Sequence, residues 1–283
     1  MTEILKINHL SVTPKNAPER FLVKDATFNL SAGKTTCIVG ESGSGKSLTA
    51  LSIMGLLSKQ LQSSGSVVFN GQDITKLEMK ALQKIRGAKI GMIFQEPMTS
   101  LNPVLTVGYQ IGESLSAHLG LKGAGLKLRI ESLLIQVGIP VERANSYPDE
   151  LSGGQRQRVM IAMSIACEPA LLIADEPTTA LDVTVQAQIL KLLDELKTRM
   201  NMAMLFITHD FGVVADIADD VIVMFRGEIV ETGTKNAVLN TPKHPYTKAL
   251  LACVPDAEGL KQLKPIDYAW LKEDQLNVAK VAV

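Results

Sequence analysis

The chain reads Gly40-Glu41-Ser42-Gly43-Ser44-Gly45-Lys46-Ser47 between a β-rich run at 35–39 and an apolar run at 48–57. This stretch fits the pattern G-x-x-x-x-G-K-[ST], in which glycines let successive backbone N–H groups turn toward a phosphate chain. The helix that follows adds the positive end of its dipole. A glycine-rich turn with an incidental lysine is the alternative, but the strand before and the helix after favour a phosphate-binding loop.

Each residue type in this loop has a chemical reason. Lys46 would reach the β- and γ-phosphates as a point charge, and the Ser47 hydroxyl would take one position in the octahedral shell of Mg²⁺. The expected nucleotide-binding set is Gly40, Glu41, Ser42, Gly43, Ser44, Gly45, Lys46, Ser47 and Leu48.

Two acids follow a second apolar run. Residues 171–174 lie after Pro169 and lead into Asp175 and Glu176. Such a run predicts a buried parallel strand, whose carboxyl end opens into the crevice where α/β sheets bind ligands. We expect Asp175 to hold Mg²⁺ through water and Glu176 to polarise the attacking water. Two solvated acids at a strand end are the alternative.

Two further polar residues come just after predicted strands. Gln95 follows the hydrophobic stretch 90–94, and His209 follows 203–208. The Gln95 side chain can ligate Mg²⁺ or position water, and His209 can donate a hydrogen bond to a γ-phosphate. Without the surrounding motifs, Gln95 would be interpreted as a solvated residue at a strand end, and His209 as a structural histidine.

Residues 151–155 read Leu-Ser-Gly-Gly-Gln and precede a helical run at 156–167. Alone, the glycine pair could mark only a helix start. Together with residues 40–47, Gln95, 171–176, 180–182 and His209, this order resembles that of the ATP-binding cassette ATPases, over roughly residues 4–255. The resemblance implies an α/β P-loop NTPase with a parallel-sheet core, an N-terminal antiparallel β subdomain and an inserted helical subdomain.

The resemblance also implies that one chain makes an incomplete site. In the family, the 151–155 segment at a helix start covers the γ-phosphate of ATP held by a partner's phosphate loop. A residue at the position of Asp182 lies on the same seam, so ATP joins two subunits head to tail. The residues carried over to this role are Ser152, Gly153, Gly154, Gln155 and Asp182.

Two segments, 93–103 and 244–251, resemble the ATPase subunits of dipeptide, oligopeptide and nickel permeases. Those ATPases usually pair as two related subunits beneath two multi-span membrane subunits, with a binding protein outside the membrane that delivers substrate. By this resemblance, residues 96–103 are the candidate contact for a membrane subunit. Residues 244–251 either have a contact role of this kind or form a proline-interrupted turn leading into a surface helix with no contact role.

The chain departs from this subfamily at two points. Many relatives carry a cysteine-rich C-terminal iron–sulfur segment, but Cys37, Cys167 and Cys253 are too scattered for paired ligands, so no such cluster is expected. The aromatic residue that stacks on adenine is also unassigned. Phe21 is the nearest candidate, although its ring could instead enter the core.

Composition fits a peripheral ATPase on the cytoplasmic face of the cell membrane. The 283 residues include 29 basic and 29 acidic side chains, which gives no electrostatic argument for nucleic acid. The sequence has no run of bilayer-spanning length, and its start lacks a leader pattern. The expected layout is an ATPase domain at 1–255, with a core at 1–94 and 166–240, a helical subdomain at 96–165, and a tail at 256–283.

We therefore predict the energy-coupling subunit of an importer for peptides or related solutes, with ATP and Mg²⁺ as cofactors. Two alternatives stay open: an ATPase of a phosphonate-degradation complex, and a clamp acting on nucleic acid or ribosomes. Balanced charge and the lack of a second cassette disfavour the clamp.

Overall fold

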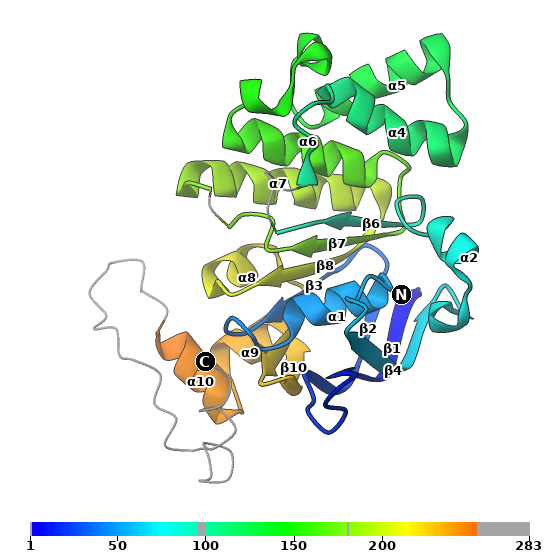
Figure 1. Cartoon of the computed structure of the whole chain (residues 1–283). Helices are drawn as coiled ribbons and strands as arrows, with labels where there is room; N and C mark the ends of the chain where they lie inside the picture. The colour runs from blue at the N-terminus through cyan, green and yellow to red at the C-terminus, as the bar shows by residue number, and fades with distance from the viewer. Residues whose placement is uncertain (1, 96–99, 180, 254–283) are drawn as a thin grey trace.

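The computed structural model describes residues 2–95, 100–179 and 181–253. Within them, six strands form the central sheet (Figure 1). Across the sheet the order is β10 (Glu228–Thr234), β9 (Asp220–Phe225), β3 (Thr35–Val39), β8 (Ala203–Thr208), β7 (Leu171–Asp175) and β6 (Ile90–Ile93). The strands from β9 to β6 run parallel, and β10 pairs antiparallel with β9. The predicted parallel core is confirmed, and the carboxyl ends of its strands share one edge.

Each central strand divides its side chains between two hydrophobic cores. In β3, Cys37 and Val39 belong to one core, while Ile38 belongs to the other. Strands β7, β8 and β9 alternate in the same way. Because both faces of the sheet are covered, these strands read as uninterrupted apolar runs rather than as alternating ones.

Helices cover the two faces unequally. On one face lies α1 (Lys46–Ile53), whereas α6 (Gly153–Ile165), α7 (Val183–Met200) and α8 (Phe211–Ile217) pack on the other. Helix α1 ends four residues earlier than the apolar run at 48–57 suggests. Gly55 turns the chain there with a φ of 60°, and Leu57 packs against the core from the turn that follows.

A second, antiparallel sheet packs over α1. Its order is β2 (Val23–Ser31), β1 (Glu3–Pro14), β4 (Leu61–Phe69) and β5 (Gln72–Asp73). Leu5 and Ile7 of β1 are fully buried and share a core with Ile53 of α1. The short helices η1 (Ile74–Lys76) and α2 (Met79–Gln83) then lead to β6. The expected N-terminal antiparallel β subdomain is confirmed.

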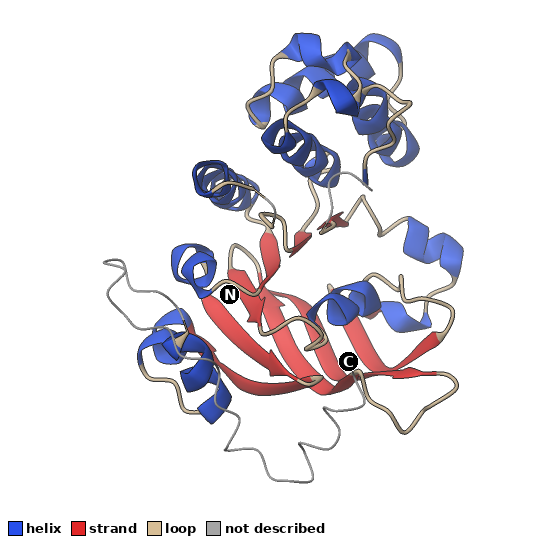
Figure 2. Ribbon diagram, turned by 60° about the vertical axis from the view of Figure 1, so that its left-hand side comes forward, coloured by secondary structure: helices blue, strands red, loops and turns tan. Residues whose placement is uncertain are grey.

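Residues between β6 and β7 form a cluster of helices at one end of the molecule (Figure 2). It comprises α4 (Val107–Leu119), α5 (Gly123–Gln136), η2 (Val141–Asn145), η3 (Pro148–Glu150) and α6. The sequence predicts helical stretches around 107–119 and 127–137; α4 matches the first, while α5 begins four residues before the second. Among the described residues, no helix combines the length and apolar character needed to cross a bilayer.

The described chain ends in two short helices beside the antiparallel edge of the central sheet. These are α9 (Lys235–Asn240) and α10 (Pro245–Ala252). Val238 and Tyr246 are buried in the same core as alternate residues of β9. The C-terminal helices thus pack on strand β9, which lies next to the strand that leads into the phosphate loop.

Candidate active site

The predicted phosphate loop links β3 to α1, and two of its glycines are required by their surroundings. A Cβ on Gly40 would lie 2.2 Å from the carbonyl oxygen of Met224 in β9. Gly45 has a φ of 102°, and a Cβ there would lie 2.9 Å from the carbonyl oxygen of Leu22. Backbone packing against neighbouring strands therefore excludes side chains at both positions, and the loop runs close to β9.

Lys46 is buried at the start of α1, where its ammonium group donates to the carbonyl oxygens of Gly40 at 2.8 Å and Glu41 at 2.9 Å. Burial lowers the Lys46 pKa, and the nearby carboxylates of Glu176 and Asp175 oppose that shift. A buried cation inside a glycine-rich loop is suited to a polyanionic ligand, which would replace the hydration that the lysine has lost.

The Ser44 hydroxyl is also buried and has no hydrogen-bond partner among the described residues. Buried polar groups in proteins are normally satisfied, so a hydroxyl without a partner among the described residues suits a ligand that accepts from it. A phosphate oxygen would accept its hydrogen bond. The loop's donor set therefore fits a triphosphate.

Ser47 and Asp175 meet across the gap between α1 and β7. The Ser47 hydroxyl donates to Oδ1 of Asp175 at 3.0 Å. Burial raises the pKa of the Asp175 carboxyl, and the hydrogen bond from Ser47 partly offsets that shift. A hydroxyl beside a buried carboxylate supplies the hard oxygen ligands that Mg²⁺ prefers, so this pair fits a magnesium ion.

Glu176 is held by three side chains at a single carboxylate oxygen, Oε2. Thr179 donates to it at 3.0 Å and Gln95 at 3.3 Å, and Nδ1 of His209 lies 3.2 Å away. The structure therefore brings together Gln95, Glu176 and His209, which the sequence places at three different strand ends. Thr179 was not predicted. Its signal is a hydroxyl three residues after the glutamate, within reach of that side chain across a turn.

The backbone of Glu176 is strained. Its φ is 47°, in the left-handed region that glutamate rarely adopts, and its N–H donates to the carbonyl oxygen of Ile207 at 2.9 Å. Strain of this kind costs on the order of 1–3 kcal/mol and clusters at functional sites. Here it turns the side chain away from the strand direction, toward Gln95 and His209.

The segment 151–155 begins α6 with a reciprocal cap. The Ser152 hydroxyl accepts from the Gln155 N–H at 3.3 Å, and the Gln155 side chain accepts from the Ser152 N–H at 3.0 Å. The helix thus begins at Gly153, earlier than the run at 156–167 suggests. Among the described residues, nothing lies within 4 Å of where a Cβ on Gly153 would be, so this residue faces open space.

Asp182 caps α7 in a similar way, by accepting from the N–H of Val185 at 2.9 Å. A Cβ on Gly154 would lie 2.8 Å from Cγ1 of that valine. The starts of α6 and α7 therefore lie against each other. The residues predicted for a subunit seam therefore come together at the starts of these two helices.

The ring of Phe21, the candidate for stacking on adenine, is 46% exposed. The interpretation of this ring as a core residue is therefore wrong.

The candidate contact segment 96–103 is described only in part, because residues 96–99 lie outside the described chain. The predicted tail at 256–283 also lies outside it. Leu101 is buried, and Gln110 of α4 was missed by sequence reasoning: its amide group brackets the backbone at Asn102 with hydrogen bonds of 2.8 and 3.0 Å.

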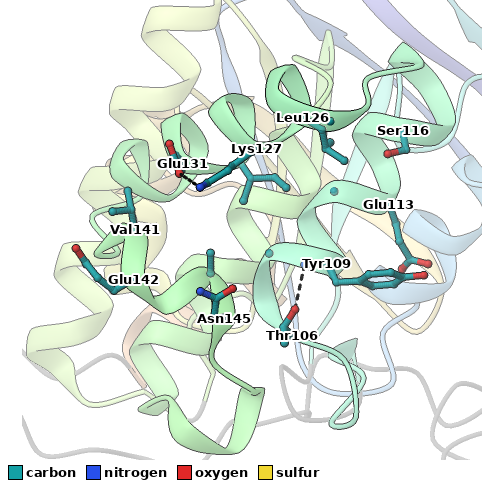
Figure 3. Close-up of a pocket in the computed structure, with 15 residues that line it drawn as sticks. Thr106, Tyr109, Glu113, Ser116, Leu126, Lys127, Glu131, Val141, Glu142 and Asn145 are labelled. Carbon is teal, nitrogen blue, oxygen red and sulfur yellow. Dashed lines mark hydrogen bonds and ion pairs between the residues drawn. The ribbon is translucent and has the colours of Figure 1, made fainter.

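Two hollows lie outside the phosphate loop. One, of about 330 Å³, lies beside the segment that carries Gln95 and is lined by Phe94, Ser100 and Met163, among others. A larger one, of about 760 Å³, lies within the helical cluster between α4, α5 and η2 (Figure 3). All of its lining residues fall within 106–145, so it is separate from the phosphate loop.

Comparisons with known proteins agree with this geometry. A family model described as "ABC transporter" matches residues 23–179, and one described as "Oligopeptide/dipeptide transporter, C-terminal region" matches residues 230–277. The oligopeptide transport ATP-binding protein OppD of Bacillus subtilis is 49% identical over 264 residues, covering 92% of this chain and 74% of OppD. The peptidoglycan transport ATP-binding protein YejF of Agrobacterium fabrum is 54% identical over 260 residues, covering 90% of this chain. The chain spans about half of YejF, 48% of its length.

Solved structures give the same result. The cassette MJ0796, in a dimeric post-hydrolysis state bound to ADP and Pi, matches with a TM-score of 0.73 and 30% identity, covering 82% of this chain and 99% of that one. The structure of cbiO1 from Clostridium perfringens, part of the ABC transporter complex cbiONQ, matches with a TM-score of 0.75 and 28% identity, covering 85% of this chain and 92% of cbiO1.

The strain at Glu176 can be measured by comparing two substitutions that both remove the carboxylate. Glycine adopts a φ of 47° freely, whereas alanine keeps the Cβ clash. We expect Glu176→Gly to be more stable than Glu176→Ala by about 1 kcal/mol in urea unfolding. In ordinary helix interiors the order is reversed. Equal stability, or a more stable alanine variant, would contradict strain at this position.

Proposed function

Because the chain belongs to the ABC transporter family, we propose that it is the ATP-hydrolysing, energy-coupling subunit of a membrane importer for peptides or related small solutes. The observation that carries this proposal is the match of residues 230–277 to the oligopeptide/dipeptide transporter C-terminal region. The relatives above are named for oligopeptide and peptidoglycan transport. Neither name points to a phosphonate-degradation complex or to a nucleic-acid clamp.

The domain layout of the proposal follows the predicted boundaries. Residues 1–255 form the ATPase domain, with a core at 1–94 and 166–240 and a helical subdomain at 96–165, and residues 256–283 form a tail. In the ATPase domain, the phosphate loop from Gly40 to Leu48 binds the triphosphate. Support comes from the buried Lys46 ammonium group and the buried Ser44 hydroxyl.

Ser47, Asp175 and Gln95 would hold Mg²⁺, which when bound polarises the phosphate oxygens and neutralises developing charge. Glu176 is the general base for the attacking water. Thr179 fixes the direction of its carboxylate by a hydrogen bond, and His209 and Gln95 approach the same oxygen. Because Gln95 contacts Glu176 and also leads into 96–103, movement of that segment would shift the base.

A second cassette subunit completes the site. Ser152, Gly153, Gly154, Gln155 and Asp182 would cover the ATP held by the partner's phosphate loop. Support comes from the exposure of the α6 start, where Gly153 faces open space. A helix N-terminus with outward N–H groups is suited to a phosphate. The partner is a related ATPase, in a head-to-tail heterodimer.

Two multi-span permease subunits would be the membrane partners, at the cytoplasmic face of the cell membrane. The hollow beside Phe94 and Ser100 adjoins the Gln95 segment and is partly apolar, which suits a short helix of a membrane subunit. Substrate would reach the permease from an extracytoplasmic binding protein, without contact to this chain. Nucleic acid is not an expected partner.

The import proposal is tested by purifying the chain from its native membrane in mild detergent. We expect two multi-span proteins and a second cassette ATPase to co-purify, as identified by mass spectrometry. Recovery of soluble lyase subunits or of ribosomes in their place would overturn the proposal.

The general-base role is tested by Glu176→Gln in the assembled complex. Loss of a general base typically costs about 10²–10⁴-fold in rate, so steady-state ATP hydrolysis should nearly vanish. MgATP affinity should stay within about twofold, because the phosphate loop is intact. Normal turnover by this variant would remove Glu176 from the base role.

The Lys46→Ala variant is the control for that experiment. It removes the cation of the loop and keeps Glu176, so it should weaken MgATP binding itself. Unchanged affinity in a titration would contradict the phosphate role of Lys46.

The seam role of residues 151–155 is tested by Gly153→Ala. A Cβ at this position meets nothing within 4 Å among the described residues, so the isolated subunit should keep its stability and its MgATP affinity. In the assembled complex the methyl group would sit in the seam, and hydrolysis should fall by about tenfold or more. Wild-type hydrolysis by the variant would place Gly153 outside the partner's nucleotide site.

A further inference from the structure

Tyr246 is buried where α10 meets the central sheet. Its side chain is fully buried, and its ring lies 4.2 Å from the ring of Phe225 at the end of β9, at an interplanar angle of 41°. One interpretation of residues 244–251 is a proline-interrupted turn leading into a surface helix with no contact role. Tyr246 is not on the exposed side of that helix, because its ring is buried in the same core as Phe225.

The hydroxyl of this tyrosine reaches the phosphate loop. It accepts a hydrogen bond from the backbone N–H of Glu41 at 3.1 Å, across 205 positions of sequence. Buried tyrosine hydroxyls normally find a polar partner, and here the partner is the second residue of the loop. The carbonyl oxygen of Glu41 in turn accepts from the ammonium group of Lys46. One loop residue therefore connects Tyr246 with the lysine.

Hydrogen bonds at the start of α10 fix the position of Tyr246. The carboxylate of Glu231 in β10 accepts from the N–H groups of Lys243 at 2.8 Å and His244 at 3.0 Å. The imidazole of His244 then caps α10 by accepting from the N–H of Tyr246 at 3.2 Å. The start of α10 is thus attached to β10 by hydrogen bonds at consecutive residues.

Strand β9 adds a second, shorter connection. The carbonyl oxygen of Met224 lies against Gly40, and the next residue, Phe225, contacts the Tyr246 ring. The entry of the phosphate loop therefore contacts both β9 and the tyrosine hydroxyl. Both contacts act on residues 40–41, before the loop reaches Lys46.

We propose that Tyr246 is a positioning residue for the phosphate loop: its hydroxyl holds the Glu41 peptide so that the loop is preorganised for a triphosphate. The proposal rests on the proposed role of residues 40–48 in binding ATP. It gives the C-terminal segment a task inside the ATPase itself. Preorganisation lowers the entropy lost on binding, so losing the hydroxyl should weaken nucleotide binding and leave the hydrolytic step unchanged.

The test is Tyr246→Phe in the full chain, which keeps the ring and removes only the hydroxyl. We expect the MgATP dissociation constant to rise about five- to tenfold, since a single hydrogen bond contributes about a factor of ten or less. In the assembled complex KM for ATP should rise by a similar factor, while kcat stays within about twofold. Amide hydrogen exchange at Glu41 should become faster.

Tyr109→Phe is the matched control. It also removes one tyrosine hydroxyl, but Tyr109 is 56% exposed and lies on α4, outside the phosphate loop. It should leave MgATP affinity unchanged. A purely structural role for Tyr246 would lower the fraction of binding-competent protein at an unchanged dissociation constant. That result, or wild-type affinity and KM in the phenylalanine variant, would overturn the proposal.

Lys46→Ala in the same titration distinguishes nucleotide binding by the loop from positioning of the loop by Tyr246. If it weakens MgATP binding and Tyr246→Phe does not, the loop binds nucleotide and only the positioning role fails. If Lys46→Ala has no effect, the proposed function of the loop itself fails.

Discussion

Parallel hydrogen bonding of β3, β8 and β7 is the constraint on which the rest of the site depends. In this register Val39 pairs with Thr208, and Asp175 pairs with Ile207. The phosphate loop, His209 and the acidic pair therefore leave the sheet at the same edge and at nearly the same level. Strand β8 lies between β3 and β7, so one strand separates the phosphate loop from Glu176.

Burial then sets the chemistry of the groups gathered at that edge. Lys46 and Asp175 are both buried, and burial shifts their pKa values in opposite directions, each toward the neutral form. Their mutual proximity opposes both shifts. The burial of these two charged groups and the strained backbone of Glu176 both lower folding stability. In return, the charged groups of the site are held in fixed positions.

The same edge is reinforced from the distal end of the chain. Strands β9 and β10 follow β8 in sequence and lie on the other side of β3, so the segment after them returns to the phosphate loop. Tyr246 reaches that loop because Phe225 and Glu231 fix where α10 begins. The helical cluster, by contrast, meets the site through the connection after β6, where Gln95 lies.

Local sequence by itself determined the elements and the identity of the chemical groups. The runs at 35–39, 171–174 and 203–208 are short and carry no charged residue before their ends, which favours buried strands. The glycine spacing at 40–47 likewise determined a phosphate loop, since it specifies backbone directions within a few residues.

Only the tertiary structure decided which groups meet. The contact of Gln95 with Glu176 spans 81 positions of sequence, and the reach of Tyr246 to Glu41 spans 205. Neither follows from local pattern, because strand order and the packing of α10 on β9 arise from burial summed over the whole chain.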